Sequence, residues 1–285
     1  MPSKLQDNGL LSDARVYLSG PMDFVASRED EKEHGWRNRI GEFLKAMGVT
    51  VFDPWFKPEV RGLHEYGVEG ETTTQQRQYW TFEPGPEGAK ARSLLAESFW
   101  PAMHIDLRMV DTSDFIVAYC PTNVYSVGTP HEIIMARQQR KPVLLVSPPI
   151  EFSALKELTA HLANDTKGAE MVGRLTEQVP IKENPEGSPS LWYMPLIGGE
   201  HFFDGFGFEE FAEDFKWQHI RLDDEEKSHK PKKPLLQFLV ELNHQLPKKW
   251  DRVKQEFVTN DDWLLWNLKK DKSGAQVNNV AGRRV

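Results

Sequence analysis

Two acidic side chains are the strongest candidates for chemistry in this sequence of 285 residues. Glu132 follows Thr129-Pro-His131 and stands one turn into an expected helix, and Asp106 lies on the expected helix before the preceding strand. Two carboxylates that flank one anomeric carbon can cleave a glycosidic bond through an oxocarbenium-like transition state. We therefore interpret Glu132 as a candidate nucleophile and Asp106 as its partner.

Each carboxylate also has a structural interpretation. Thr129 as the N-cap, Pro130 as the first helical residue and Glu132 as the third fit a capping box, in which Glu132 bonds back to the N-cap amide. Asp106 taken alone is more commonly a solvated aspartate on a helix face. The local spacing leaves both alternatives open.

The elements that would position these residues alternate between strand and helix. Apolar runs bounded by Gly, Pro or Asp predict strands at residues 15–19, 49–52, 115–119 and 143–146. Helical patterns stand between them, with one helix ending at Gly48 and the others covering 103–110 and 129–141. This order predicts an α/β fold with a doubly wound parallel sheet, in which ligands bind beyond the carboxyl ends of the strands.

Two stretches depart from this alternation. Residues 55–101 contain five glycines and many aromatic side chains, which favours an ordered, lid-like insert, although a plain surface excursion is almost as well supported. Residues 184–285 form an expected, mostly helical C-terminal extension packed on a first domain of residues 1–183. Further patterns predict a linker at residues 183–190, a strand at 192–197, and helices at 153–176, 209–217 and 235–246.

Composition and motif content narrow the function. The net charge of −8 argues against binding to nucleic acid polymers or anionic membranes, and no apolar run approaches the roughly 20 residues of a spanning helix. The single cysteine, Cys120, cannot form an internal disulfide, so we expect a cytoplasmic protein. The nine histidines show no metal-ligand spacing, and the sequence lacks Walker A, complete Gly-x-Gly-x-x-Gly and Gly-x-Ser-x-Gly motifs.

Four short motifs stand in order on the expected elements. They are Tyr17-Leu-Ser-Gly-Pro-Met22, Asp53-Pro54, the helix of Asp106, and Ser126-Val-Gly-Thr-Pro-His-Glu132. In this order they resemble the nucleoside 2-deoxyribosyltransferase superfamily, which includes the 2′-deoxynucleoside 5′-monophosphate N-hydrolases. The resemblance covers roughly residues 14–150 without the insert.

The resemblance implies a flavodoxin- or Rossmann-like sheet and a covalent mechanism. Glu132 would attack the anomeric carbon of a nucleoside or nucleotide, and Asp106 would orient the nucleophile or protonate the leaving base. The implied substrate-binding residues are Tyr17, Gly20, Met22, Asp53, Ser126 and Gly128. The resemblance implies no metal or organic cofactor, and it implies a homodimer or a higher homo-oligomer.

Two positions bear on the 5′-phosphate of such a substrate. By the same resemblance, the hydrolases tend to carry a phosphate-binding serine at the position of Ser126, where the transferases tend to carry an aspartate. A serine offers the phosphate a donor without adding negative charge. Asp23 argues against a phosphate-binding site, because the hydrolases often carry a phosphate-binding arginine at that position.

The sequence therefore supports three functions. The first is an N-glycosidase that cleaves the base–sugar bond of a (deoxy)nucleoside 5′-monophosphate through a covalent glycosyl-glutamate at Glu132. An alternative is a nucleoside 2-deoxyribosyltransferase that exchanges bases. A second alternative is a nucleotide-binding sensor module without catalysis.

Overall fold

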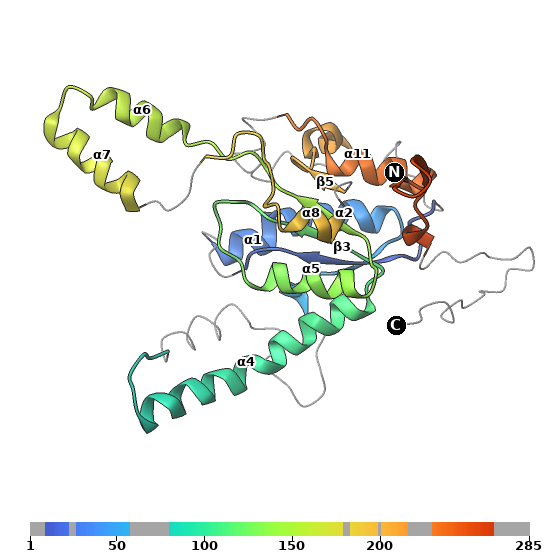
Figure 1. Cartoon of the computed structure of the whole chain (residues 1–285), viewed down its shortest axis with the longest axis horizontal. Helices are drawn as coiled ribbons and strands as arrows, with labels where there is room; N and C mark the ends of the chain where they lie inside the picture. Colours follow the sequence, from blue (N-terminus) through green and yellow to red (C-terminus); the bar gives the residue numbers. More distant parts are fainter. Residues whose placement is uncertain are drawn as a thin grey trace, which may run out of the picture.

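The central feature of the molecule is a five-stranded parallel sheet (Figure 1). The computed structural model describes residues 9–22, 27–57, 80–178, 183–198, 201–215 and 230–264. The strands are β1 (Arg15–Ser19), β2 (Thr50–Phe52), β3 (Phe115–Tyr119), β4 (Val143–Val146) and β5 (Phe202–Phe203). Their order is β2-β1-β3-β4-β5, which is flavodoxin-like and confirms the predicted α/β fold.

Helices cover both faces of this sheet. The α-helices are α1 (Arg28–His34), α2 (Trp36–Ala46), α4 (Pro86–Thr112), α5 (Gly128–Gln138), α6 (Ser153–His161), α7 (Thr166–Gln178), α8 (Tyr193–Ile197), α9 (Ala212–Phe215) and α11 (Leu235–His244). Short 3₁₀ turns are η1 (Pro54–Phe56), η2 (Phe208–Phe211) and η4 (Asp261–Leu264), and β6 (Lys248–Asp251) pairs antiparallel with β7 (Glu256–Thr259). In Figure 1, α6, α7 and the first half of α4 extend away from the sheet.

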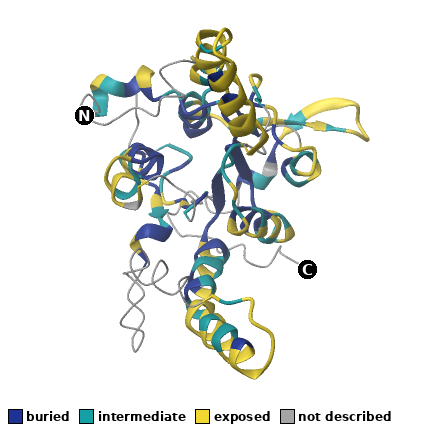
Figure 2. Ribbon diagram, turned by 90° about the vertical axis from the view of Figure 1, so that its left-hand side faces the viewer, coloured by how far each residue is buried: buried dark blue, intermediate teal, exposed yellow. Residues whose placement is uncertain are grey.

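The two-residue period of β1 separates two apolar cores. Val16 and Leu18 face a cluster built with α2 and α11, whereas Tyr17 faces a second cluster built with α4, α5 and α8. Figure 2 shows the strands as the buried centre of the molecule. Each fully buried Leu or Phe stabilises the fold by about 1.5–3 kcal/mol. The second cluster matters for function, because Ser19 shares its side of the strand with Tyr17.

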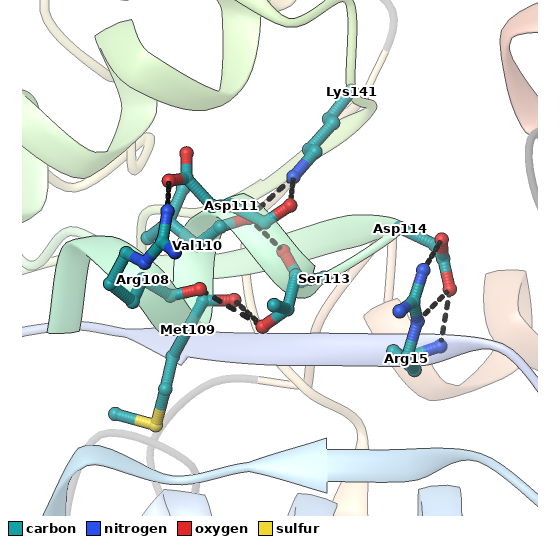
Figure 3. Close-up of polar contacts among 9 residues, drawn as sticks. Arg15, Arg108, Met109, Val110, Asp111, Ser113, Asp114 and Lys141 are labelled. Carbon is teal, nitrogen blue, oxygen red and sulfur yellow. Dashed lines mark hydrogen bonds and ion pairs between the residues drawn. The ribbon is translucent and has the colours of Figure 1, made fainter. Parts of the chain in front are cut away.

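Two polar clamps fix the ends of β1, β3 and α4 (Figure 3). The guanidinium of Arg15 donates to both carboxylate oxygens of Asp114, at 3.0 Å from Nε and 2.8 Å from Nη2. The buried ammonium of Lys141 donates to the carbonyls of Val110 (2.5 Å) and Asp111 (2.6 Å). A cation at this position satisfies carbonyls that the last turn of α4 leaves open and complements the helix dipole.

The first helical region agrees with the sequence and contains one additional break. The Ser27 side chain accepts from the Asp30 amide at 3.2 Å and caps the start of α1. Gly48 has φ +79 just beyond α2, which confirms the predicted helix end. The helix is divided at Gly35, where a Cβ would stand 2.3 Å from the Glu31 carbonyl oxygen.

The prediction for residues 55–101 is wrong in its second half. Residues 86–101 are the first part of α4, a continuous helix of 27 residues that runs through Pro101. Proline inside a helix normally removes a hydrogen bond and clashes with the preceding turn, so the sequence favoured a break there. The helix formers on both sides of Pro101 outweigh that cost. Residues 58–79 of the predicted insert lie outside the described residues.

Beyond residue 183 the sequence predictions are mixed. The strand predicted at 192–197 is wrong, because Tyr193–Ile197 forms α8, and the two-residue β5 was not predicted. The helix predicted at 209–217 begins as η2 and continues as α9 to Phe215. The boundary predicted at residue 183 falls between β4 and β5 of one sheet, and the division into two domains stays a prediction.

The length and hydropathy of these helices bear on membrane insertion. Within the described ranges, no helix is both long enough and apolar enough to cross a membrane.

Candidate active site

The predicted catalytic residues lie at the switch point of the sheet, where the chain leaves β1 toward β2 and β3 toward β4. In parallel sheets of this order, the crevice beyond the carboxyl ends of the two central strands is the usual ligand site. Tyr17 and Ser19 come from β1, and Glu132 comes from the second turn of α5. The fold therefore brings residues more than a hundred positions apart to one edge of the sheet.

Glu132 is buried and held by two hydroxyl groups. Its Oε1 accepts from the Tyr17 hydroxyl at 2.8 Å, and its Oε2 accepts from the Ser19 hydroxyl. The residue is only 8% exposed, and this burial raises the pKa of the carboxyl group above its ordinary value. The two hydroxyl bonds, together with the charges of Arg37 and Lys57, oppose that increase. The result is an oriented carboxylate with little contact with water.

The capping-box interpretation of Glu132 is wrong. The helix begins at Gly128 with Val127 as its N-cap, so Thr129 is already inside the first turn. The Thr129 amide donates to the Ser126 hydroxyl at 3.4 Å, and the two hydroxyls lie 2.9 Å apart. Ser126 therefore accepts from one amide of the first turn, and Glu132 is directed at β1 instead.

Asp106 belongs to the same group of charges. Its Oδ2 lies 2.8 Å from Nζ of Lys57, whose side chain is 1% exposed. The pKa of the Tyr17 phenol is raised well above its ordinary value by burial first, and then by the negative charges of Glu132 and Asp106. Both carboxylates therefore act on one phenol, which stays protonated and can donate to Glu132.

A buried arginine lies beside this group and binds the loop after β1. The Arg37 side chain donates to the carbonyls of Leu18 and Pro21, both at 3.3 Å, and pairs with Glu31 at 3.2 Å. These bonds hold the loop after β1 against α2. The close approach requires Gly20, because a Cβ there would stand 3.0 Å from Nη2 of Arg37 and 2.8 Å from a neighbouring ring carbon.

Comparison with known proteins gives distant matches in fold. No protein-family model matches the chain, and no curated protein matches it. A 2-deoxyribosyltransferase from the psychrotolerant bacterium Bacillus psychrosaccharolyticus is 20% identical, with 51% of this chain and 80% of that chain covered and a TM-score of 0.26. A conserved protein from Enterococcus faecalis V583 is 14% identical, with coverage of 73% and 99% and a TM-score of 0.33.

The remaining predicted binding residues stand in different settings. Gly128 is exposed at the start of α5, and a Cβ there would be 4.0 Å from Oε1 of Glu132. Asp53 accepts from the Trp55 amide at 2.9 Å, and burial raises the pKa of its carboxyl group. Met22 is partly buried at the end of a described range. Their binding roles stay predictions, and Asp23 lies outside the described residues.

Three residues near the site were not predicted. They are Ser19, Arg37 and Lys57. Ser19 had a signal, because it stands two positions after Tyr17 and a strand places such residues on one face. The residues next to Arg37 and Lys57 in the sequence gave no signal for either, because each of them acts through a contact with a distant element.

Thiol and metal chemistry are not indicated at this site. Burial raises the pKa of the Cys120 thiol to about 12, with a smaller contribution from the charge of Glu132, so Cys120 stays protonated. Among the described residues, no group of His, Cys, Asp and Glu side chains is arranged to hold a metal ion.

Proposed function

We propose that the chain is an N-glycosidase that cleaves the base–sugar bond of a nucleoside 5′-monophosphate, with Glu132 as the nucleophile. The observation that carries this proposal is the buried carboxylate of Glu132, oriented by Tyr17 and Ser19 at the switch point of the sheet. A carboxylate that has lost most of its water reacts more readily with a cationic carbon. It is also oriented before the substrate arrives.

The proposed reaction has two displacements. In the first, a Glu132 oxygen forms a bond to C1′ of the sugar while the C1′–N bond breaks. The base leaves with the bonding electron pair and takes up a proton. In the second, water attacks C1′, the ester bond to Glu132 breaks, and the proton of the water passes to solvent. The products are free base and sugar phosphate, and the carboxylate is restored.

Asp106 is proposed to act through Lys57 rather than as the acid that protonates the base. An ammonium at 2.8 Å favours the ionised form of a carboxyl group, and an ionised group has no proton to give. Lys57 also places a positive charge where it acts on Glu132. Lys57 thus helps to keep the nucleophile ionised despite its burial, and Asp106 is proposed to hold the Lys57 ammonium in place.

The phosphate of the substrate is proposed to bind at the start of α5. An 11-residue helix presents free amides and the positive end of its dipole there, and Gly128 leaves the first turn open. Ser126 adds a hydroxyl at the same end. Ser126→Asp should therefore weaken a nucleoside monophosphate much more than the matching nucleoside, measured by the ratio of their KM values. Equal losses for both ligands would contradict the phosphate assignment.

The decisive experiment compares the wild type with Glu132→Gln on a panel of deoxynucleoside monophosphates. Chromatography should show free base and sugar phosphate, and kcat/KM should fall about 10³-fold or more in the variant. Intact-protein mass spectrometry of the wild type during turnover should show the added sugar phosphate. Glu157→Gln, on an exposed helix, is the control and should keep full activity. A Glu132→Gln protein with more than a tenth of wild-type activity would contradict the proposal.

The same experiment separates the alternative functions. The burial of Glu132 also favours base exchange, because a covalent intermediate formed there is shielded from water. A transferase would form a new nucleoside when a second base is added, at the expense of free sugar. A nucleotide sensor would show a ligand-dependent rise in Tm without any product. The predicted homo-oligomer stays a prediction.

A further inference from the structure

A cavity lies at the amino ends of β4 and β5. Pro142, directly before β4, and His201, directly before β5, stand in its wall, so it faces the amino ends of strands whose carboxyl ends face the candidate active site. Its volume is about 270 Å³. That is slightly below the roughly 300–1,000 Å³ of typical small-molecule sites, so it suits a small organic ligand.

The wall of this cavity carries an excess of positive charge. Arg137 comes from the last turn of α5, and Lys249 and Arg252 come from the β6–β7 hairpin. Asp262 is the acidic residue in the wall and lies 3.6 Å from Lys249. Three cations against one carboxylate leave two positive charges, which matches a doubly charged anion.

The hydrogen bonds of His201 fix which of its two ring nitrogens carries the proton. The Asp262 amide donates to Oδ1 of Asn260 at 3.1 Å, which orients the amide group of Asn260. Nδ2 of Asn260 therefore donates to Nε2 of His201, 3.1 Å away. Burial, and then the charges of Lys233 and Arg137, lower the pKa of His201 to about 4, so the ring is neutral at pH 7. Its proton must then be on Nδ1.

Nδ1 of His201 is a buried donor, and it has no hydrogen-bond partner in the described part of the chain. A water-sized probe does not reach this nitrogen, so Nδ1 lies behind the wall of the cavity and not on its surface. Buried donors without acceptors are rare in folded proteins and carry a desolvation cost. The choice of ligand therefore rests on the charge excess in the wall, which favours an anion with acceptor oxygens.

We propose that this cavity, the basic cavity, binds the phosphate group of a small phosphomonoester. Arg137, Lys249 and Arg252 would bind the phosphate, while Pro142, Ile197 and Trp250 provide apolar walls for the organic part. A phosphomonoester is favoured over inorganic phosphate because the cavity has room for more than a single tetrahedral ion. The proposal does not depend on catalysis at Glu132.

Isothermal titration calorimetry with phenyl phosphate at low ionic strength tests the basic cavity. The double variant Lys249→Gln, Arg252→Gln removes two of the cations and should weaken binding at least tenfold. The matched control is Lys248→Gln, Lys254→Gln, which removes the same charge from exposed positions on the same hairpin and should change affinity less than twofold. Phenol, which has the ring without the phosphate, should give no measurable binding.

A further arm separates this cavity from the candidate active site. Ser126→Asp should leave the phenyl phosphate affinity of the basic cavity unchanged, because Ser126 lies at the other end of α5. If Ser126→Asp removes the binding, or if the two hairpin variants lose affinity equally, the basic cavity is not a phosphate site. An absence of binding to the wild type at millimolar ligand would also overturn the proposal. Should the double variant unfold, Arg252→Gln alone changes one exposed side chain and gives the same comparison.

Discussion

The hydroxyl of Tyr17 sets part of the acidity of Glu132. A hydrogen bond donated to a carboxylate stabilises its ionised form and lowers its pKa, while burial has the opposite effect. Because a nucleophilic Glu132 must be ionised in the free enzyme, the acidic limb of kcat/KM against pH reports this pKa. We expect that limb to lie above pH 4.5, the ordinary value for a glutamate.

Tyr17→Phe should move the acidic limb of the kcat/KM profile to higher pH. The substitution removes the 2.8 Å bond to Oε1 and leaves burial in place, so the Glu132 pKa rises. The measurement is a full pH profile of both proteins. Tyr193→Phe is the matched control, because the Tyr193 hydroxyl bonds to Cys120 and not to Glu132. An unchanged limb in Tyr17→Phe, or an equal shift in both variants, would contradict this role.

At the scale of the residue, the sequence singled out side chains that the structure brings together, but it did not indicate their contacts. Glu132, Asp106 and Tyr17 could be selected by motif, and the structure places all three in one electrostatic group. The side chains that contact these three residues could not be selected by motif. Lys57 reaches Asp106 across 49 positions, and nothing in its neighbouring residues records that contact.

The loop after β1 packs closely against α2. Glycine is required at position 20 because α2 leaves no room for a Cβ atom there, and not because of an unusual backbone angle. Gly20→Ala should destabilise the fold by about 1–3 kcal/mol, because the added Cβ meets the Trp36 ring at 2.8 Å and the Arg37 guanidinium at 3.0 Å. Activity should fall as well, since Arg37 would be displaced. Urea unfolding and kcat/KM measure the two effects.

Gly41→Ala is the matched control for this prediction. Gly41 is also buried, but it lies inside α2 and a Cβ there meets Val51 at 3.9 Å, which is ordinary contact. Alanine in a helix interior should leave stability unchanged or raise it by up to about 1 kcal/mol. A Gly20→Ala protein as stable and active as Gly41→Ala would show that the crowding at Gly20 is relieved without cost.

Helices and strands could be predicted where the local sequence pattern favours the same structure as the contacts in the fold. β1, β3 and β4 are continuous apolar runs, and they appear where the sequence places them. α4 was truncated in the prediction because Pro101 and nearby glycines resemble a break, and only the formed helix shows that the break is tolerated. β5 has two residues and leaves no period to detect.

His201 connects the pH to the stability of the whole molecule. Its folded pKa of about 4 lies below the ordinary 6.5, so the unfolded chain binds the proton more tightly. Stability is therefore complete above pH 6.5 and is lost as the pH falls toward 4, by about 3 kcal/mol. Asp53 and Glu132 act in the opposite sense, because their raised pKa values make the folded state the better proton acceptor.

Comparing the loss of unfolding free energy in acid between the wild type and His201→Gln isolates the contribution of His201. Urea unfolding at pH 7 and at pH 4.5 should show a smaller acid loss in His201→Gln than in the wild type, because glutamine does not titrate. His161→Gln, on the exposed side of α6, should keep the wild-type pH dependence. Equal acid losses in wild type and His201→Gln would contradict the assignment.

At the scale of the molecule, the alternation of strand and helix patterns predicted the parallel α/β sheet. It did not predict the fifth strand that completes the sheet. The alternation up to residue 146 predicts four strands in one sheet. The fifth strand and α11 come from the C-terminal part of the chain, where α11 closes the first core and Asn243 accepts from the amides of Leu10 and Leu11. Contacts across 232 positions leave no trace in a local pattern.

The pairing of β1 with β3 has a consequence for the protein as it is being made. Arg15 and Asp114, which clamp the two strands together, are 99 positions apart. At about 5–20 residues per second, a ribosome needs roughly 5–20 s to synthesise that interval. During that time nascent β1 can pair with β2, but the side that carries Tyr17 has no cover from α4 or α5. The growing chain therefore exposes the side of β1 that carries Tyr17 and Ser19 before the rest of the candidate site has been made.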